Sequence, residues 1–577
     1  MKPRYIYAAA LLLPALIAPA TAAAQHLKGS VTVEGEYMPD VIHPDRINML
    51  PPVVRYQPER SAMPYALDGV GADFTPSNIP LPSTGWRAER PRYAGRGYID
   101  LSLGSWLNSN LSAGVTPLSD DVQRLGVWLQ HNSTSLWRPN SGIDARRYSY
   151  QESLGVDYSR RIGDAGTLTA GVQYRLGLFN YYAFIPAGNG SMPTQTLNDA
   201  AFRIGWNSDR LVLRGSRYNA AVRGRYFGYR DGQREFDLGL EGGYAFVWGD
   251  NATVGIDGVA DILFNSASAD YNALANYGLV SLTPYYEMKR EQMRLRLGVD
   301  VDIAANADGA APDTHYGVFH FAPDVRFDVR GRSVGFYAHA TGGNQAHTLA
   351  LSEQWDSYCA PYLLSTQPIY TPVDARLGLE FGPFGGFSAG LEGRFKYTMH
   401  LPTEGWNGAL LNNELLHPTD MRGINLSGVS AGLTLRYSLG EVFSISAAAS
   451  YQPQSEKHGY FNGLDRPKWL VDAEVSCRPI SKLQLMVAYR LRADRNITQC
   501  VKQQSGGNVI INGGSEYVNE LTPLPSISAL EASATWHVTD RFGVSVRGAN
   551  LLNRHEVLLP SLNSEGITLY GGVSILF

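Results

Sequence analysis

The sequence predicts an all-β protein: a transmembrane antiparallel β-barrel of about 22 strands, within a range of about 16–22, with long extracellular loops and short periplasmic turns. Three observations lead to this prediction. The chain opens with an export signal but has no later apolar run long enough for a membrane helix. Alternating segments follow one another from about residue 93 onward. The last of these segments ends the chain on an aromatic residue.

The export signal occupies residues 1–24. Lys2 and Arg4 precede an apolar run from Tyr5 to Ala20, and three alanines before Gln25 offer a small-residue cleavage site. This pattern is typical of a secretory signal peptide, and no cysteine follows the site that could carry a lipid anchor. An exported chain without membrane helices is either a soluble secreted protein or a membrane barrel, whose strands are only half apolar.

The composition favours the barrel. The 577 residues include 33 Tyr, 20 Phe, 10 Trp and 60 Gly, which suits aromatic girdles and many tight turns. The net charge of -4 gives no indication of nucleic-acid binding. With only 3 Cys, a disulfide-rich scaffold is excluded.

The alternating segments and their connections show a regular order. Clear strands begin near Ile99, Arg146, Leu168, Phe236, Thr253, Met293, Phe387, Trp469, Leu483 and Phe542. Short connections rich in turn formers lie near residues 118–121, 162–166, 207–209, 248–251, 330–332, 382–386, 439–441, 478–481 and 538–541. Longer ones span about 133–145, 181–196, 265–276, 304–315, 343–370, 399–423, 453–467, 495–526 and 552–566. Short and long connections largely alternate along the chain, as periplasmic turns and extracellular loops do in outer-membrane barrels.

Individual strands separate an apolar face from a charged one. In Met293–Ile303, Leu295 and Leu297 alternate with arginines and aspartates, and Phe387–Tyr397 repeats the pattern. The charges expected on the luminal face are Arg294, Arg296, Asp300, Asp302, Glu392, Arg394 and Lys396. Charges of both signs at a wet lumen indicate either an ion-pair lining or a dedicated substrate track.

The last eleven residues predict the strand that closes the barrel. Apolar and small or polar residues alternate along Ile567–Phe577, and the residues we assign to the closing strand include Tyr570, Val573, Ile575 and Phe577. In a bilayer every backbone donor has to be paired, so a spanning sheet closes on itself.

The C-terminal block resembles the barrel of TonB-dependent outer-membrane receptors. Asn550-Leu551-Leu552-Asn553 leaves the penultimate strand, as an Asn-Leu-apolar-Asn element does in that family, and a last strand ending in an aromatic residue follows. The strand rhythm extends the likeness over residues 93–577, which we assign to the barrel. The resemblance implies ligand uptake driven by an energising partner.

The segment ahead of the barrel departs from that family. Such receptors carry a folded plug domain inside the barrel, whereas only residues 25–92 lie between the signal and the first clear strand. This segment contains ten prolines and is too short for a plug of mixed sheet. We expect an extended chain in the periplasm or the lumen, without a full plug.

Several loop residues are candidates for ligand contact or cross-linking. The aromatic residues of the long connections are Tyr181, Tyr182, Phe184, Trp355, Tyr358 and Tyr362. They serve either as a platform for a ligand or as lipid-interface and packing residues. Cys359 and Cys500 fall in two long connections and are candidates for a disulfide. No convincing Ser/His/Asn or carboxylate/His set emerges, so we predict no enzymatic activity, no cofactor and no metal site.

Two classes of function follow from the sequence. In the first, the chain is a plugless receptor-like barrel in the cell outer membrane that takes part in transport, with a partner or its own N-terminal segment filling the lumen. In the second, it is a structural or accessory barrel subunit of an envelope assembly. The expected partners are outer-membrane lipid, the assembly machinery that inserts barrels, and a surface lipoprotein, plug or periplasmic protein. The ligand is not indicated by the sequence.

Overall fold

The computed structural model divides the chain into two units, Met1–Ala66 and Leu67–Phe577. All described residues belong to the second unit. They are 96–135, 148–163, 165–180, 194–208, 215–230, 232–249, 251–267, 275–307, 316–355, 367–407, 410–411, 414–415, 420–456, 467–502, 517–554, 556–559 and 562–577. The predicted signal peptide and the segment 25–92 lie outside these residues.

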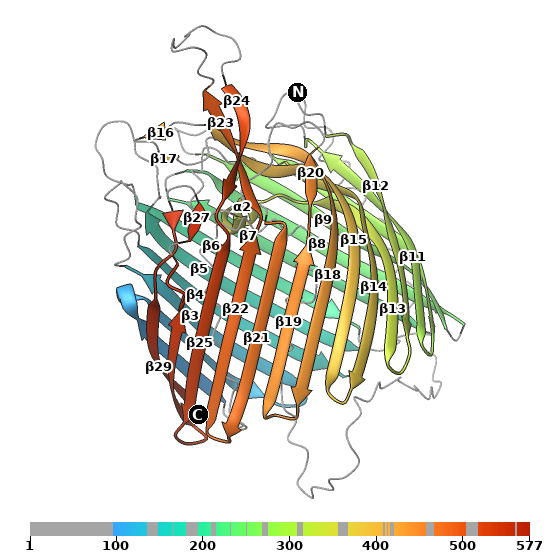
Figure 1. Cartoon of the computed structure of the whole chain (residues 1–577). Helices are drawn as coiled ribbons and strands as arrows, with labels where there is room; N and C mark the ends of the chain where they lie inside the picture. Colours follow the sequence, from blue (N-terminus) through green and yellow to red (C-terminus); the bar gives the residue numbers. More distant parts are fainter. Residues whose placement is uncertain are drawn as a thin grey trace, which may run out of the picture. The chain divides into compact units, whose positions relative to one another are not determined.

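Twenty-two antiparallel strands form a closed barrel, as the sequence predicts (Figure 1). The strands of the barrel are β1 Gly97–Gly104, β2 Ser109–Ser119, β3 Gln123–Thr134, β4 Ser149–Ile162, β5 Gly166–Asn180, β6 Thr194–Asn207, β7 Ser216–Tyr229, β8 Arg234–Trp248, β9 Ala252–Ser266, β10 Tyr277–Arg290, β11 Met293–Ala305, β12 Phe319–Arg330, β13 Val334–Gln345, β14 Ile369–Phe384, β15 Phe387–Asn407, β18 Asp420–Leu439, β19 Phe443–Tyr451, β21 Trp469–Ile480, β22 Leu483–Ala493, β25 Ile527–His537, β26 Phe542–Ala549 and β29 Thr568–Leu576.

The last strand closes the barrel on the first. β29 pairs with β26 on one side and with β1 on the other, where Ile575 lies opposite Ile99. At the end of this seam the backbones of Gly97 and Phe577 exchange two hydrogen bonds, of 2.8 and 3.0 Å. Within the described residues, closure pairs each of the 22 barrel strands on both sides, which is what a spanning sheet requires.

The outer face of the barrel is apolar because every second residue along each strand, on the face away from the lumen, tends to carry a large hydrophobic side chain. On β11, for example, Leu297 and Val299 are exposed, while Asp302 on the other parity is buried. Directly paired residues of a sheet share a face, so the strand register carries this assignment around the barrel. Among the described residues, no helix is long and apolar enough to cross a bilayer.

The two ends of the barrel differ in their connections. One end, here called the turn end, holds the predicted short turns and one more, between Arg290 and Met293. The other, the loop end, holds all nine predicted long connections. It also has two short ones that the sequence analysis did not separate, between Gly104 and Ser109 and between Tyr229 and Arg234. A 3-10 turn, η3 (Ser105–Leu107), occupies the first of these.

The Asn-Leu-Leu-Asn element has a structural explanation. Asn550 and Asn553 adopt positive φ angles of 49° and 50°, a backbone conformation that asparagine tolerates better than most residues. The Asn550 side chain donates to the carbonyls of Arg554 and Glu565, at 2.8 and 2.6 Å. The Asn553 side chain accepts from the backbone N–H of Ile567 at 3.3 Å. The two amides therefore tie the exit of β26 to the entry of β29.

Several smaller elements lie at the loop end. They are the helix α2 Leu349–Trp355 and the short strands β16 Leu410–Leu411, β17 Glu414–Leu415, β20 Gln454–Glu456, β23 Arg495–Lys502, β24 Tyr517–Leu524, β27 Val557–Leu559 and β28 Leu562–Asn563. β23 and β24 pair as a hairpin that extends beyond the barrel strands (Figure 1).

Candidate functional site in the barrel lumen

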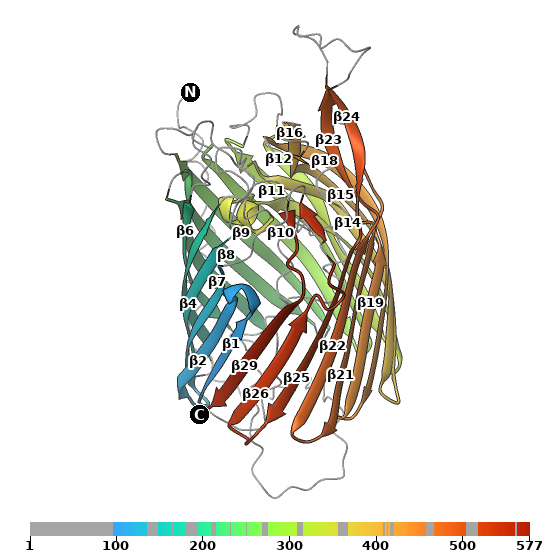
Figure 2. The ribbon, with the colours of Figure 1, turned by 60° about the vertical axis from the view of Figure 1, so that its left-hand side comes forward.

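The first part of the connection from β13 to β14, residues 346–355, turns into the barrel. The sequence predicts an outer loop over residues 343–370, but residues 347–353 bond to side chains of β5, β8 and β10. These strands lie on one side of the barrel, and α2 lies against their inner face near the loop end (Figures 1 and 2). The helix is the first element of the candidate site.

The start of α2 is capped by a wall residue. Both carboxylate oxygens of Glu235 on β8 accept from the backbone N–H of Leu349, at 3.1 Å each. The Thr348 hydroxyl accepts from the backbone N–H of Leu351 at 3.1 Å. A carboxylate and a threonine at a helix N-terminus satisfy donors that have no partner within the helix. Glu235 is only 2% exposed, so this cap is formed in the protein interior.

The Tyr277 hydroxyl forms hydrogen bonds with both the backbone carbonyl and the backbone N–H of His347. Tyr277 on β10 donates its hydroxyl to the His347 carbonyl at 2.8 Å and accepts from the His347 N–H at 3.0 Å. The imidazole Nε2 lies 2.8 Å from the Ser352 hydroxyl. Complete burial lowers the pKa of His347 to about 3, because the interior disfavours the charged ring. His347 is therefore neutral at physiological pH.

An ion-pair chain joins α2 to the wall. Glu353 accepts from Arg175 on β5 at 2.9 Å, and Arg175 also contacts Asp199 on β6 at 3.1 Å. Asp199 in turn accepts two hydrogen bonds of 2.7 Å from Arg225 on β7. The Asp199 and Glu353 side chains are 6% and 10% exposed, so water screens the attraction in this chain less than in a surface pair.

The other side of α2 reaches a different part of the barrel. Leu351 packs on an apolar cluster formed by Ile369, Leu401 and Leu426, which belong to β14, β15 and β18. Leu349 is fully buried. The helix thus contacts β5, β8 and β10 through polar groups and β14–β18 through an apolar one, which places it across part of the lumen.

A cavity of about 590 Å³ lies between this connection and the wall of β3–β9. Its charged lining residues are Asp157, Arg203, Arg223, Arg225, Asp237 and Asp261. Arg223 pairs with Asp261, and Arg203 with Glu241. The Asp237 carboxylate is 7% exposed, and its Oδ1 has no hydrogen-bond partner among the described residues. The lining can offer a polar ligand both donors and acceptors.

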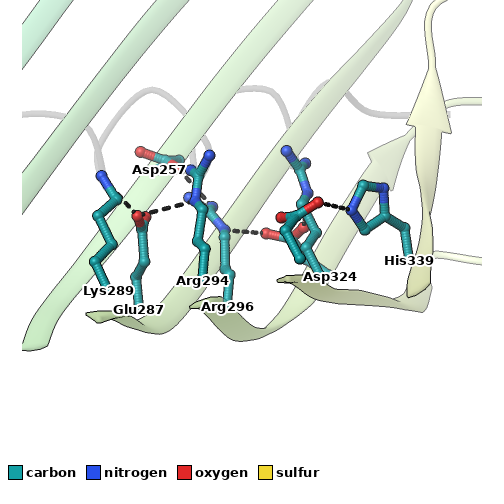
Figure 3. Close-up of polar contacts among 9 residues, drawn as sticks. Asp257, Glu287, Lys289, Arg294, Arg296, Asp324 and His339 are labelled. Carbon is teal, nitrogen blue, oxygen red and sulfur yellow. Dashed lines mark hydrogen bonds and ion pairs between the residues drawn. The ribbon is translucent and has the colours of Figure 1, made fainter. Parts of the chain in front are cut away.

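The charges predicted on β11 take part in ion pairs on the lumen side. Arg296 contacts Asp257 at 2.7 Å and Asp324 at 2.6 Å (Figure 3). Its guanidinium also stacks on the Tyr285 ring. Arg294 contacts Glu287 at 3.1 Å. Both arginines therefore have carboxylate partners on neighbouring strands.

The remaining predicted charges of β11 and β15 have partners as well. Asp300 and Asp302 accept from Thr283 and Ser281 on β10. Arg394 on β15 pairs with Asp374 at 2.6 Å, and Glu392 accepts from the Tyr337 hydroxyl. Lys396 lies opposite Asp374 in the register and is half-buried.

Most of the predicted loop residues fall outside the described part of the chain. These are Tyr181, Tyr182, Phe184, Tyr358, Tyr362 and Cys359. Trp355 is the last residue of α2. Cys500 lies in β23, opposite Asn519 of β24. The disulfide and the ligand platform therefore stay predictions.

The lumen has a second, contrasting wall along β19, β25, β26 and β29. Following the register from Arg394, the lumen-facing positions there include Ser444, Ser446, Ala448, Ser533, Ser545 and Gly572. Glu531 and Arg547, which pair at 2.8 Å, and Tyr570 are the large residues among them. Ser444 and Ser446 are exposed. We call this the small-residue wall, and β5–β10, against which α2 lies, the docking wall.

The residues that hold α2 were missed by the sequence analysis. Thr348 followed by Leu349-Ala350-Leu351 is a helix-start signal that could have been found, because threonine is a preferred N-cap residue. Glu235, Tyr277 and Arg175 carry no such signal, since only the fold brings them to the connection.

No protein-family model and no curated protein sequence matches the chain. Solved structures do match over most of its length. The siderophore receptor PirA from Acinetobacter baumannii superposes with a TM-score of 0.61 at 12% identity, covering 85% of this chain and 81% of that one. The FrpB iron transporter from Neisseria meningitidis gives 0.61 at 11%, covering 83% and 81%. The copper transporter OprC gives 0.57 at 12%, covering 85% and 81%. The barrel therefore resembles that of TonB-dependent receptors, as the C-terminal block predicts.

Proposed function

We propose that this protein is an integral outer-membrane barrel that takes part in the uptake of small polar solutes, with α2 and its connection narrowing the lumen. The observation that carries the proposal is the docking of α2 inside a closed barrel of 22 strands. The fold it shares with known metal and siderophore transporters supports an uptake role but does not identify a solute.

A barrel of this size needs a filling element. At about 22 strands a barrel encloses a lumen far wider than a porin channel, and transporters of that size are plugged. The segment 346–355 supplies one such element, because α2 contacts both the β5–β10 strands and the apolar cluster of β14, β15 and β18. We propose that solutes pass between α2 and the small-residue wall, where hydroxyls and small side chains leave the most room.

The N-terminal segment is the second filling element in this proposal. Residues 25–92 contain ten prolines and are too few for a large core of their own, but an extended chain of this length can cross a lumen. The segment either lines the lumen or leaves it to meet a periplasmic partner, plug or surface lipoprotein. Outer-membrane lipid and the barrel-assembly machinery are the other expected partners.

Permeability and co-purification distinguish these roles. Deleting residues 25–92 raises the uptake of large antibiotics if the segment fills the lumen. It releases co-purifying proteins without raising permeability if the segment binds a partner, as expected for an accessory subunit of an envelope assembly. A deletion that changes neither result contradicts both roles.

The orientation in the membrane is tested separately. We propose that the loop end faces the outside, because long connections are extracellular in barrels of this kind. A tag inserted in the 495–526 connection should then be labelled on intact cells, whereas a tag at Gly382–Gly386 on the turn end should not. The reverse labelling pattern would contradict the orientation.

A further inference from the structure

A serine, a histidine and a glutamate meet on the outside of the barrel. Ser109 on β2, His131 on β3 and Glu152 on β4 come from three neighbouring strands, and His131 lies directly opposite Glu152 in the register. The Ser109 hydroxyl is 2.9 Å from His131 Nε2. His131 Nδ1 is 2.5 Å from a Glu152 carboxylate oxygen.

The strand register places these side chains on the outer face. Trp128 on β3 and Asp157 on β4 line the luminal cavity and share a hydrogen bond of 3.0 Å. Side chains along a strand alternate between its two faces, and an odd number of positions separates His131 from Trp128 and Glu152 from Asp157. His131 and Glu152 therefore point outward, away from the lumen. The apolar residues of that parity, which include Leu129, Leu154 and Val156, are exposed. The exposed apolar surface therefore lies directly beside the three polar residues, on the side toward the turn end.

The group also lies where the strands leave the membrane. Ser109 is the first residue of β2 and comes two residues after η3, in which Trp106 and Leu107 are exposed. Both residues have positive φ angles, 62° and 53°, which cost energy for residues other than glycine. Tyr150 is exposed on the outer face of β4 near the same height. Exposed Trp and Tyr side chains favour the boundary between hydrocarbon and headgroups.

We propose that Ser109, His131 and Glu152 form a catalytic triad that hydrolyses the carboxylic esters of long-chain membrane lipids. A hydroxyl bonded to an imidazole, which is oriented by a carboxylate, is the arrangement that activates a serine nucleophile. The ester bonds of acyl lipids lie at the boundary between the hydrocarbon and the headgroups, beside the exposed apolar face of β3 and β4. Glu152 acts through His131 and is a positioning residue.

The reaction needs only the ester and water. The Ser109 oxygen attacks the ester carbonyl carbon, and His131 Nε2 takes the hydroxyl proton while Nδ1–H donates to Glu152. The C–O bond to the alcohol breaks, His131 returns the proton to the departing oxygen, and a lysolipid leaves an acylated Ser109. A water molecule, deprotonated by His131, then attacks the acyl carbon. The fatty acid leaves, and Ser109 regains its proton.

A second hydroxyl lies beside the nucleophile. Ser133 Oγ is 2.6 Å from Ser109 Oγ. Because Ser109 donates its one hydrogen to His131, Ser133 is the donor in the contact between the two serines. After the attack on the carbonyl, the same hydroxyl is placed to donate to the developing oxyanion, which is the task of an oxyanion-hole donor.

The test uses the full-length protein in mixed micelles with palmitoyl-oleoyl-phosphatidylethanolamine, prepared from a host without its own outer-membrane esterases. Mass spectrometry follows the release of fatty acid and lysolipid. We expect wild-type protein to release both, and Ser109→Ala and His131→Asn to lower the rate at least about 100-fold. Ser112→Ala, on the same strand but facing the lumen, is the matched control and should keep the wild-type rate.

Two further measurements separate catalysis from folding. A fluorophosphonate probe should phosphonylate Ser109 in the folded barrel, forming an O–P bond and releasing fluoride, whereas heat-denatured protein should stay unlabelled. Glu152→Asp should retain more activity than Glu152→Gln when both variants show normal heat-modifiable migration. Absence of both lipid hydrolysis and Ser109 labelling in folded wild type would overturn the proposal, as would hydrolysis that persists in Ser109→Ala.

Discussion

The docking wall and the small-residue wall use the same strand geometry for different purposes. On the docking wall, lumen-facing positions carry long charged side chains that bond to each other and to α2, as Arg175 does with Asp199 and Glu353. On the small-residue wall, serine, alanine and glycine occupy many of the equivalent positions, and Glu531 and Arg547 form an ion pair among them. The two walls therefore differ in side-chain length: the docking wall holds α2 through long charged side chains, and the small-residue wall carries mostly short ones.

The largest expected effect concerns buried ion pairs. Arg394 and Asp374 have side chains that are 4% and 9% exposed, whereas Arg490 and Asp472 near the small-residue wall are 20% and 49% exposed. Arg394→Met should lower the free energy of unfolding by about 2–3 kcal/mol, because the buried Asp374 carboxylate loses two hydrogen bonds and keeps only Arg376, at 3.0 Å. Arg490→Met should cost under about 1 kcal/mol, because water screens that pair. Urea unfolding in detergent measures both, and equal losses would contradict the distinction.

The second effect concerns the cap of α2. Glu235→Ala removes the acceptor of the buried Leu349 N–H, so docking of the helix should weaken by about 1–3 kcal/mol. Hydrogen exchange of the backbone amides of residues 349–355 should accelerate by a factor of about 5–150. Glu241→Ala is the matched control, since Glu241 lies on the same face of β8 and pairs with Arg203 and Arg223. If both variants accelerate exchange equally, Glu235 has no special role in docking.

The third effect is a dependence on pH. Burial lowers the pKa of His347 to about 3 in the docked state, against an ordinary value of about 6.5. Between these values the undocked state binds a proton that the docked state does not, so docking loses stability as the pH falls. The loss should reach about 2 kcal/mol at pH 5.

Hydrogen exchange of α2 at pH 7 and pH 5, corrected for the intrinsic exchange rate, measures this loss. His347→Gln should reduce the loss between pH 7 and pH 5 by about 2 kcal/mol, because the amide does not titrate. A pH dependence that is unchanged in His347→Gln would assign the titration to another group.

The smallest effect on stability comes from the small-residue wall. Ser444 and Ser446 are exposed to the lumen, so replacing either by Trp should change the free energy of unfolding by less than about 0.5 kcal/mol. If solutes pass along this wall, the same variants should nevertheless lower the single-channel conductance in planar bilayers. Unchanged conductance in both variants would place the path elsewhere.

Much of the barrel could be predicted from the sequence, because alternation has a fixed physical meaning in a strand. The predicted starts at Met293, Phe387, Trp469, Leu483 and Phe542 coincide with strand starts in the structure. The closing strand was equally clear, since an uninterrupted alternation runs to Phe577.

The contacts between distant segments could not be predicted in this way. Glu235 and Leu349 are 114 residues apart, and nothing in either segment indicates the other. The Ser109, His131 and Glu152 group depends on the register of three strands, and a shift of one residue in any of them would separate the side chains. Periodicity indicates which face a residue occupies, but not which residue it meets.

The most direct test of the account replaces Thr348–Trp355 by a Gly-Ser linker of equal length and compares single-channel conductance with the wild type in planar bilayers. The variant is used only if its heat-modifiable migration shows a closed barrel. If α2 narrows the lumen from the docking wall, conductance should rise several-fold. An intact barrel with wild-type conductance would contradict the claim that this helix narrows the lumen.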